Sequence, residues 1–295
     1  MIPKLFAKHF KTIMSRCVAA LCFTLCLYSF TACKQNPMPV ESFGIVSLSP
    51  SITRQLVDLN AEDLLVGVTS YSPPLSRKIE IVGSIVVPNF EKILLLKPSV
   101  VLYSQEDSLT QQLDPLKASG LMLRSFGRNN NFEAICKNYI ELGRIINKQL
   151  EAESKVAAYK KELIAAKKDS LNISVLMLVS WKPLISVSND SFIGHIINDA
   201  GGKNIFNNTV SSYPLISSEA VALRDPDAVI IMTEGDGSGF AELFRSFSLR
   251  AIKNNNVFTI DPEHIAYYTP RDYIAAVNEI AKIISNAAFS LGKEH

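Results

Sequence analysis

The chain has 295 residues, 47% hydrophobic and 20% charged, which is enough apolar material for one large or two medium domains. Its formal charge of +2 is misleading, because residues 1–32 hold four basic side chains and no acidic one. The rest of the chain has 26 basic residues against 28 acidic ones, which argues against a nucleic-acid partner.

The first segment of the chain has the pattern of an export signal. Residues 17–32 are uncharged and follow a basic segment, and they are shorter than the ~20 apolar residues of a membrane-spanning helix. The tetrapeptide at 30–33 (FTAC) resembles a bacterial lipobox, although phenylalanine stands where leucine is usual. The resemblance implies cleavage before Cys33, lipid attachment to it and anchoring at the cell membrane, facing the periplasm or the exterior. An ordinary secretory signal is the alternative, and residues 33–41 predict a polar tether.

Cysteine usage predicts a body without disulfides. Three of the five cysteines lie in the signal core and Cys33 is the lipidation candidate, so Cys136 alone remains. A packed hydrophobic core must therefore stabilise the exported chain.

Strands and helices alternate after the tether. Strands are predicted at residues 45–48, 64–68, 79–82, 100–103 and 121–126, and helices at 52–59, 90–96 and 108–118. This alternation predicts a mostly parallel sheet covered on both faces.

A long helix is predicted at residues 144–168, which contain no Gly or Pro and carry an apolar stripe. Its start is open, because residues 132–146 are helical in pattern too. The alternation then resumes, with strands at 173–179, 228–232 and 257–260 and helices at 192–200, 241–244 and 272–291. The predicted fold is α/β, with two lobes of mostly parallel sheets joined by one long helix. The predicted boundaries are 1–32 (signal peptide), 33–41 (tether), 42–146 (first lobe), 147–168 (bridging helix) and 169–295 (second lobe).

The two predicted lobes share a local pattern. Glu91 and Glu219 each open a short helix, a proline follows seven positions later, and a hydrophobic strand then begins. The sequence therefore predicts that each lobe carries one glutamate at the same local position.

Several segments resemble the periplasmic binding proteins that serve ABC importers of cobalamin and ferric siderophores. The matching segments are 46–51 (VSLSPS), 65–69 (LVGVT), 82–83 (VG), 89–91 (NFE), 96–98 (LKP), 200–206 (AGGKNIF), 218–219 (SE), 224–227 (RDPD) and 269–271 (TPR). The resemblance implies two lobes bridged by one rigid helix, a ligand held in the cleft between them, and lobe closure of small amplitude.

The resemblance and the need for aromatic cleft walls together give the ligand-binding candidates. Tyr71 matches a corrin-contacting tyrosine of the cobalamin receptor, and Tyr213 falls where that receptor has a tryptophan. Trp181 follows a predicted strand, and His264 and Tyr267 fall where the receptor approaches the lower face of its ligand. No cofactor is implied beyond the ligand itself, a cobalt or iron chelate. A corrinoid, a ferric siderophore and haem all remain open, with a preference for the corrinoid.

The resemblance also assigns Glu91 and Glu219 to docking on a permease dimer, which works with its ATPase. The alternative is that both are acids favoured in the first turn of a helix, where the macrodipole stabilises them.

Other function classes have weaker support. A zinc or manganese receptor needs several histidines and carboxylates at one site, but residues 42–291 hold only His195 and His264. A surface lipoprotein that acts only as a scaffold leaves the paired lobes unexplained. We find no nucleotide-binding, hydrolase or metalloprotease motif, and we expect no enzymatic activity.

Overall fold

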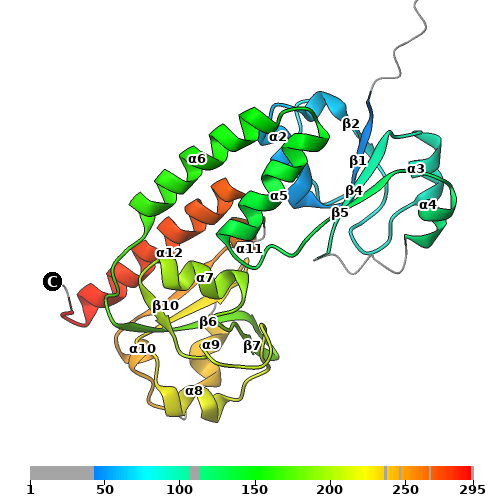
Figure 1. The fold of residues 1–295 in the computed structure, drawn as a ribbon. Helices are drawn as coiled ribbons and strands as arrows, with labels where there is room; N and C mark the ends of the chain where they lie inside the picture. The colour runs from blue at the N-terminus through cyan, green and yellow to red at the C-terminus, as the bar shows by residue number, and fades with distance from the viewer. Residues whose placement is uncertain (1–42, 106–112, 236–237, 246, 266, 294–295) are drawn as a thin grey trace, which may run out of the picture. The chain divides into compact units, whose positions relative to one another are not determined.

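Two five-stranded sheets organise the described part of the computed structural model, which covers residues 43–293 without 106–112, 236–237, 246 and 266 (Figure 1). The predicted signal peptide, Cys33 and the tether lie outside the described residues, as does part of the helix predicted at 108–118. Within the described ranges, no helix is both long and apolar enough to cross a bilayer.

The first sheet has the strand order β3-β2-β1-β4-β5, and all its pairings are parallel. Its strands are β1 (Ile45–Ser47), β2 (Leu65–Val68), β3 (Glu80–Ile81), β4 (Val100–Ser104) and β5 (Leu123–Phe126). The accompanying helices are α2 (Pro50–Asp58), the short η1 (Glu62–Leu64), α3 (Phe90–Leu95), α4 (Asp114–Ala118) and α5 (Phe132–Ile145). The mostly parallel sheet predicted for the first lobe is confirmed.

The second sheet has the order β10-β9-β6-β7, and β8 pairs with β6. Its strands are β6 (Ile173–Trp181), β7 (Leu184–Ser186), β8 (Gly202–Asn204), β9 (Ala228–Met232) and β10 (Val257–Ile260), and the β6–β7 pair alone among these is antiparallel. The helices are α7 (Phe192–Asp199), α8 (Ser218–Arg224), α9 (Ser238–Leu243), α10 (Arg250–Lys253), α11 (Pro262–Ile265) and α12 (Pro270–Ser290). The sequence pattern missed the three-residue strands β7 and β8.

The bridging helix is α6 (Gln149–Ala166), which lies within two residues of the predicted boundaries of 147–168. The helical run at 144–168, whose start was left open, begins inside the end of α5. The chain leaves α5 through Asn147, whose φ of 57° is left-handed, and the Lys148 amide donates to the Gly143 carbonyl at 2.7 Å. This is the Schellman arrangement that ends many helices, and asparagine tolerates its left-handed position well. Helix α6 packs against both α5 and α12 (Figure 1).

One hydrophobic cluster is shared by the two sheets and the helices that join them. Alternate residues of a strand point to opposite faces of its sheet. Val100 and Leu102 of β4 join the shared cluster, whereas Val101 joins a smaller cluster on the opposite face. Val175 of β6 likewise joins the shared cluster and Leu176 another small one. Burial on both faces explains why these strands read as continuous apolar runs.

The carboxylate of Asp58 joins four helices within this core. It accepts hydrogen bonds from the Tyr139 hydroxyl of α5 and, at 2.8 Å, from the Tyr159 hydroxyl of α6. The Arg271 guanidinium at the start of α12 lies 2.8 Å from the same carboxylate. Burial, and then the hydrogen bond to Asp58, raise the pKa of Tyr139. Burial also raises the pKa of Tyr159 to about 12, although the hydrogen bond from Arg271 lowers it. Asp58 therefore ties α2 to both the bridging helix and α12.

Candidate functional site

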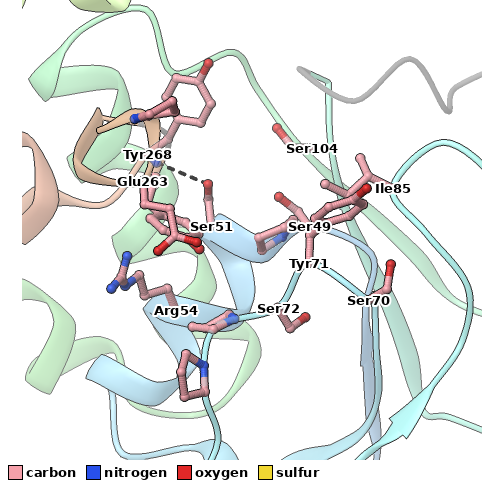
Figure 2. A pocket seen from close by; sticks show the side chains of 15 residues that line it. Ser49, Ser51, Arg54, Ser70, Tyr71, Ser72, Ile85, Ser104, Glu263 and Tyr268 are labelled. Carbon is pink, nitrogen blue, oxygen red and sulfur yellow. Dashed lines mark hydrogen bonds between the residues drawn. The ribbon is translucent and has the colours of Figure 1, made fainter. Parts of the chain in front are cut away.

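A cavity of about 680 Å³ lies where strands of both sheets end (Figure 2). Its walls follow the carboxyl ends of β1, β2, β4 and β10, which is where parallel sheets place ligands. The lining residues are Ser49, Pro50, Ser51, Arg54, Ser70, Tyr71, Ser72, Pro73, Pro74, Ile85, Ser104, Pro262, Glu263, Tyr267 and Tyr268. The volume is within the ~300–1,000 Å³ typical of small-molecule sites.

The turn between β1 and α2 forms the cavity floor. Ser49 is extended and precedes Pro50, the first residue of α2, where the missing N–H of proline costs nothing. Below the turn, the Thr53 hydroxyl donates to the Ser47 oxygen at 2.9 Å, and the Ser47 hydroxyl donates to the Ser49 carbonyl at 3.0 Å. These buried hydroxyls hold the turn in place. Because Pro50 and Ser51 at the start of α2 line the cavity, the positive end of the α2 dipole faces it.

The loop after β2 contributes an aromatic side chain and an unsatisfied hydroxyl. The Ser72 amide donates to the Thr69 carbonyl at 3.1 Å, and this turn leaves the Tyr71 side chain 67% exposed. The buried hydroxyl oxygens of Ser72 and Thr69 have no hydrogen-bond partner among the described residues. Of these two, Ser72 lines the cavity. A buried hydroxyl without a partner is costly, so both oxygens destabilise this loop.

The opposite wall comes from more than 200 positions further along the chain. The Tyr268 amide donates to the Ser51 hydroxyl at 3.1 Å, and the Gln55 side-chain amide donates to the Tyr268 carbonyl at 2.8 Å. Figure 2 shows Glu263 and Tyr268 on one side of the cavity and Tyr71 on the other. The reciprocal pair of hydrogen bonds fixes the backbone of this wall against α2.

Two charged side chains line the cavity, Arg54 and Glu263. The Arg54 guanidinium lies 4.1 Å from the centre of the Tyr267 ring, a cation–π distance, and its Nε is 3.6 Å from the Asp272 carboxylate. Arg54 thus keeps one face against an aromatic ring. The lining therefore combines apolar rings, hydroxyls and one charge of each sign.

The cavity brings together two of the five predicted ligand-binding residues, Tyr71 and Tyr267. Trp181, Tyr213 and His264 do not line it. The Trp181 ring contacts the backbone at Gly239 and lies 4.2 Å from the Lys182 ammonium, at the edge of a smaller hydrophobic cluster.

Tyr213 and His264 have other surroundings. Tyr213 is 43% exposed, and its amide donates to the Ser211 hydroxyl at 3.2 Å. The Nδ1 of His264 lies 3.1 Å from both carboxylate oxygens of Glu279 on α12. The hydrogen bond and charge of Glu279 raise the pKa of His264.

Sequence reasoning did not place Arg54 or the serines at the cavity, although they line it. A usable signal was present, because Ser49, Ser70 and Ser104 each stand at or just after the end of a parallel strand.

Both predicted docking glutamates are exposed at the start of short helices. Glu91 is the second residue of α3 and Glu219 the second residue of α8. A backbone amide and then the Ser217 hydroxyl lower the pKa of Glu219 by hydrogen bonding to its carboxylate. That carboxylate is therefore ionised at neutral pH.

The family follows from comparison with known proteins. The family model described as periplasmic binding protein matches residues 45–264. The chain belongs to the periplasmic binding protein family. The vitamin B12-binding protein of Vibrio parahaemolyticus is 25% identical over 262 residues, which cover 86% of this chain and 94% of that protein.

Solved structures are similar to this chain over most of their length. The periplasmic vitamin B12 binding protein of Vibrio cholerae has a TM-score of 0.70 and 22% identity, covering 83% of this chain and 97% of its own. The periplasmic haem binding protein of Vibrio cholerae has a TM-score of 0.73 and 20% identity, with coverages of 82% and 98%. At these identities the structural likeness establishes the fold alone. The two α/β lobes with mostly parallel sheets are confirmed.

Proposed function

We propose that this binding protein captures a metal chelate in the cavity beside Tyr71 and delivers it to an ABC permease dimer with its ATPase. The chelate is a corrinoid, a ferric siderophore or haem. The observation that carries the proposal is the composition of the cavity, in which tyrosine rings and prolines suit a flat apolar chelate. The names of the relatives, which bind vitamin B12 or haem, support the same ligand class.

We also propose that the protein is exported and anchored through a lipid on Cys33, which the lipobox-like residues 30–33 support. Metabolic labelling with a palmitate analogue tests this step. Label should enter the wild-type chain and not Cys33→Ala. Label retained in the Cys33→Ala chain would contradict the anchor.

The ligand is tested by titrating residues 43–295, which form one compact unit, with cobalamin, cobinamide, haem and several ferric siderophores. One class should bind with submicromolar affinity by calorimetry. Tyr71→Ala should weaken it about tenfold or more, since an aromatic contact is lost. Tyr213→Ala is the matched control, because this exposed tyrosine does not line the cavity.

The titration distinguishes binding in the cavity from binding elsewhere on the protein. Loss of affinity in Tyr213→Ala and none in Tyr71→Ala would place the ligand outside the cavity. Binding of none of the chelates would favour a scaffold, and binding of bare zinc or manganese alone would favour a metal-ion receptor.

Delivery is tested through the two docking glutamates. Replacing Glu91 and Glu219 together by alanine should abolish uptake of the chelate into cells while leaving its affinity for the purified protein unchanged. Undiminished uptake would refute docking through these residues.

A further inference from the structure

The structure repeats one local unit at an interval of 128 residues, more fully than the sequence pattern indicates. Asn89 caps α3 by accepting a hydrogen bond from an amide three positions on, and Ser217 caps α8 in the same way. Glu91 and Glu219 both stand two residues after their cap. The two glutamates thus occupy the same position relative to the helix start.

The repeat continues through the end of each helix. Lys97 and Asp225, each six residues after its glutamate, both adopt left-handed backbone, with φ of 45° and 41°. A proline follows each of them, and β4 and β9 then begin at equivalent positions. Left-handed backbone is uncommon for these residue types, so its recurrence shows that the two lobes share the unit in detail.

Large aliphatic side chains are exposed at matching positions around each glutamate. Four residues after the glutamates, Leu95 is 80% and Leu223 is 85% exposed. Four residues before them, Val87 is 69% and Leu215 is 73% exposed. We call Val87, Glu91 and Leu95 the N-lobe patch, and Leu215, Glu219 and Leu223 the C-lobe patch. Helices α3 and α8, which carry the glutamate and the leucine that follows it in each patch, are labelled in Figure 1.

The glutamate of each patch has no cationic partner among the described residues. Glu219 accepts hydrogen bonds only from a backbone amide and the Ser217 hydroxyl, and Lys92 beside Glu91 pairs with Glu80 at 2.6 Å. Residues four apart in a helix share a face, so Leu95 lies beside Glu91 and Leu223 beside Glu219. A single exposed leucine is ordinary. The fold does not explain why, in both lobes, an exposed leucine lies beside a carboxylate that has no ion pair among the described residues.

We propose that each patch is a composite docking site, in which the aliphatic side chains exclude water around a carboxylate that pairs with a cation of the partner. The partner has two equivalent sites, each an Arg or Lys within an apolar surround, as a two-fold symmetric dimer presents them. The occupant is the permease dimer, so this inference rests on the proposed function and adds the leucines to its interface. Contacts that exclude water around an interfacial charge pair strengthen that pair.

The test compares leucine and glutamate variants in binding to the importer. Residues 43–295, with and without cobalamin or haem, are titrated onto the candidate importers of the source cells in proteoliposomes. Leu95→Ala and Leu223→Ala together should weaken association about a hundredfold, about tenfold each, with the salt dependence retained. Glu91→Gln and Glu219→Gln together should weaken association and reduce its salt dependence. Leu150→Ala with Ile164→Ala is the control, since both lie on α6 and are 82% and 74% exposed.

The outcomes separate this inference from the proposed function. If the leucine pair binds within twofold of the wild type while the glutamate pair does not, the composite site is refuted and docking through the acids stands. If the control pair weakens binding equally, surface hydrophobicity in general is responsible and the inference fails. The leucines could instead hold two copies of this chain together. Sedimentation would then show a dimer of the wild type that is absent in the Leu95→Ala, Leu223→Ala variant, and this result would also refute the composite docking site. If the wild type binds no importer, the proposed function itself fails.

Discussion

Replacing Asp58 by alanine will loosen the junction between α2, α5, α6 and α12. The substitution leaves the hydroxyls of Tyr139 and Tyr159 without their acceptor, and both rings are buried. A buried hydroxyl that loses its partner costs about 1–3 kcal/mol. Arg271 adds little because its side chain is largely exposed, and it still reaches the Tyr159 oxygen at 3.3 Å. The free energy of unfolding should therefore fall by about 3 kcal/mol.

Urea denaturation of residues 43–295, followed by circular dichroism, measures this loss. Asp63→Ala is the control, because that carboxylate is exposed and should change stability by less than about 0.5 kcal/mol. A double-mutant cycle with Tyr139→Phe isolates the hydrogen bond, and the two losses should be clearly less than additive. A loss below about 1 kcal/mol for Asp58→Ala, or full additivity in the cycle, would refute the reasoning.

Three further predictions concern side chains outside the cavity. Burial and a carboxylate hydrogen bond raise the pKa of Tyr159 to about 12, so its stabilisation is complete below pH ~10 and is lost as the pH rises to about 12. Tyr159→Phe should lessen the alkaline loss of stability by up to ~1.4 kcal/mol per pH unit, and an unchanged slope would contradict this. Glu279 raises the pKa of His264, so this contact stabilises the fold below pH ~6.5, and its contribution is lost as the pH rises through the raised pKa. Glu279→Gln should lower the midpoint of the His264 titration measured by NMR. An unmoved midpoint would disprove the pairing. A Cβ added at Gly239 would lie 2.4 Å from the Trp181 ring, so Gly239→Ala should shift the emission of this single tryptophan, and an unaltered spectrum would contradict the packing.

Local pattern was sufficient for most of the fold. Apolar runs bounded by Gly, Pro and Ser predicted the strands of the first sheet and three of the five strands of the second to within a few residues, because strands buried on both faces need continuous hydrophobic sequence. The exact start of α6 stayed open in the sequence, since a helix-forming composition continues from α5 into α6. The left-handed Asn147 ends α5 there, and a single asparagine among good helix formers is not enough to predict a helix end.

The candidate site was only half predictable for a different reason. Tyr71 and Tyr267 were chosen for being aromatic near strand ends, and so was Trp181, which packs elsewhere. Composition cannot distinguish an aromatic side chain that faces a cavity from one that faces the adjacent core. Arg54 was not predicted to line the cavity, because an arginine in an amphipathic helix normally faces solvent.

The sequence by itself determined the two α/β lobes and the paired glutamates, because alternating apolar runs and repeated Glu-to-Pro spacing are properties of contiguous residues. Only the tertiary structure decided which residues form the cavity. Its second wall depends on hydrogen bonds from Tyr268 to Ser51 and from Gln55 to Tyr268, across more than 200 positions. Such contacts depend on how α2 and the segment before α12 meet in the folded core, and no local pattern encodes that meeting.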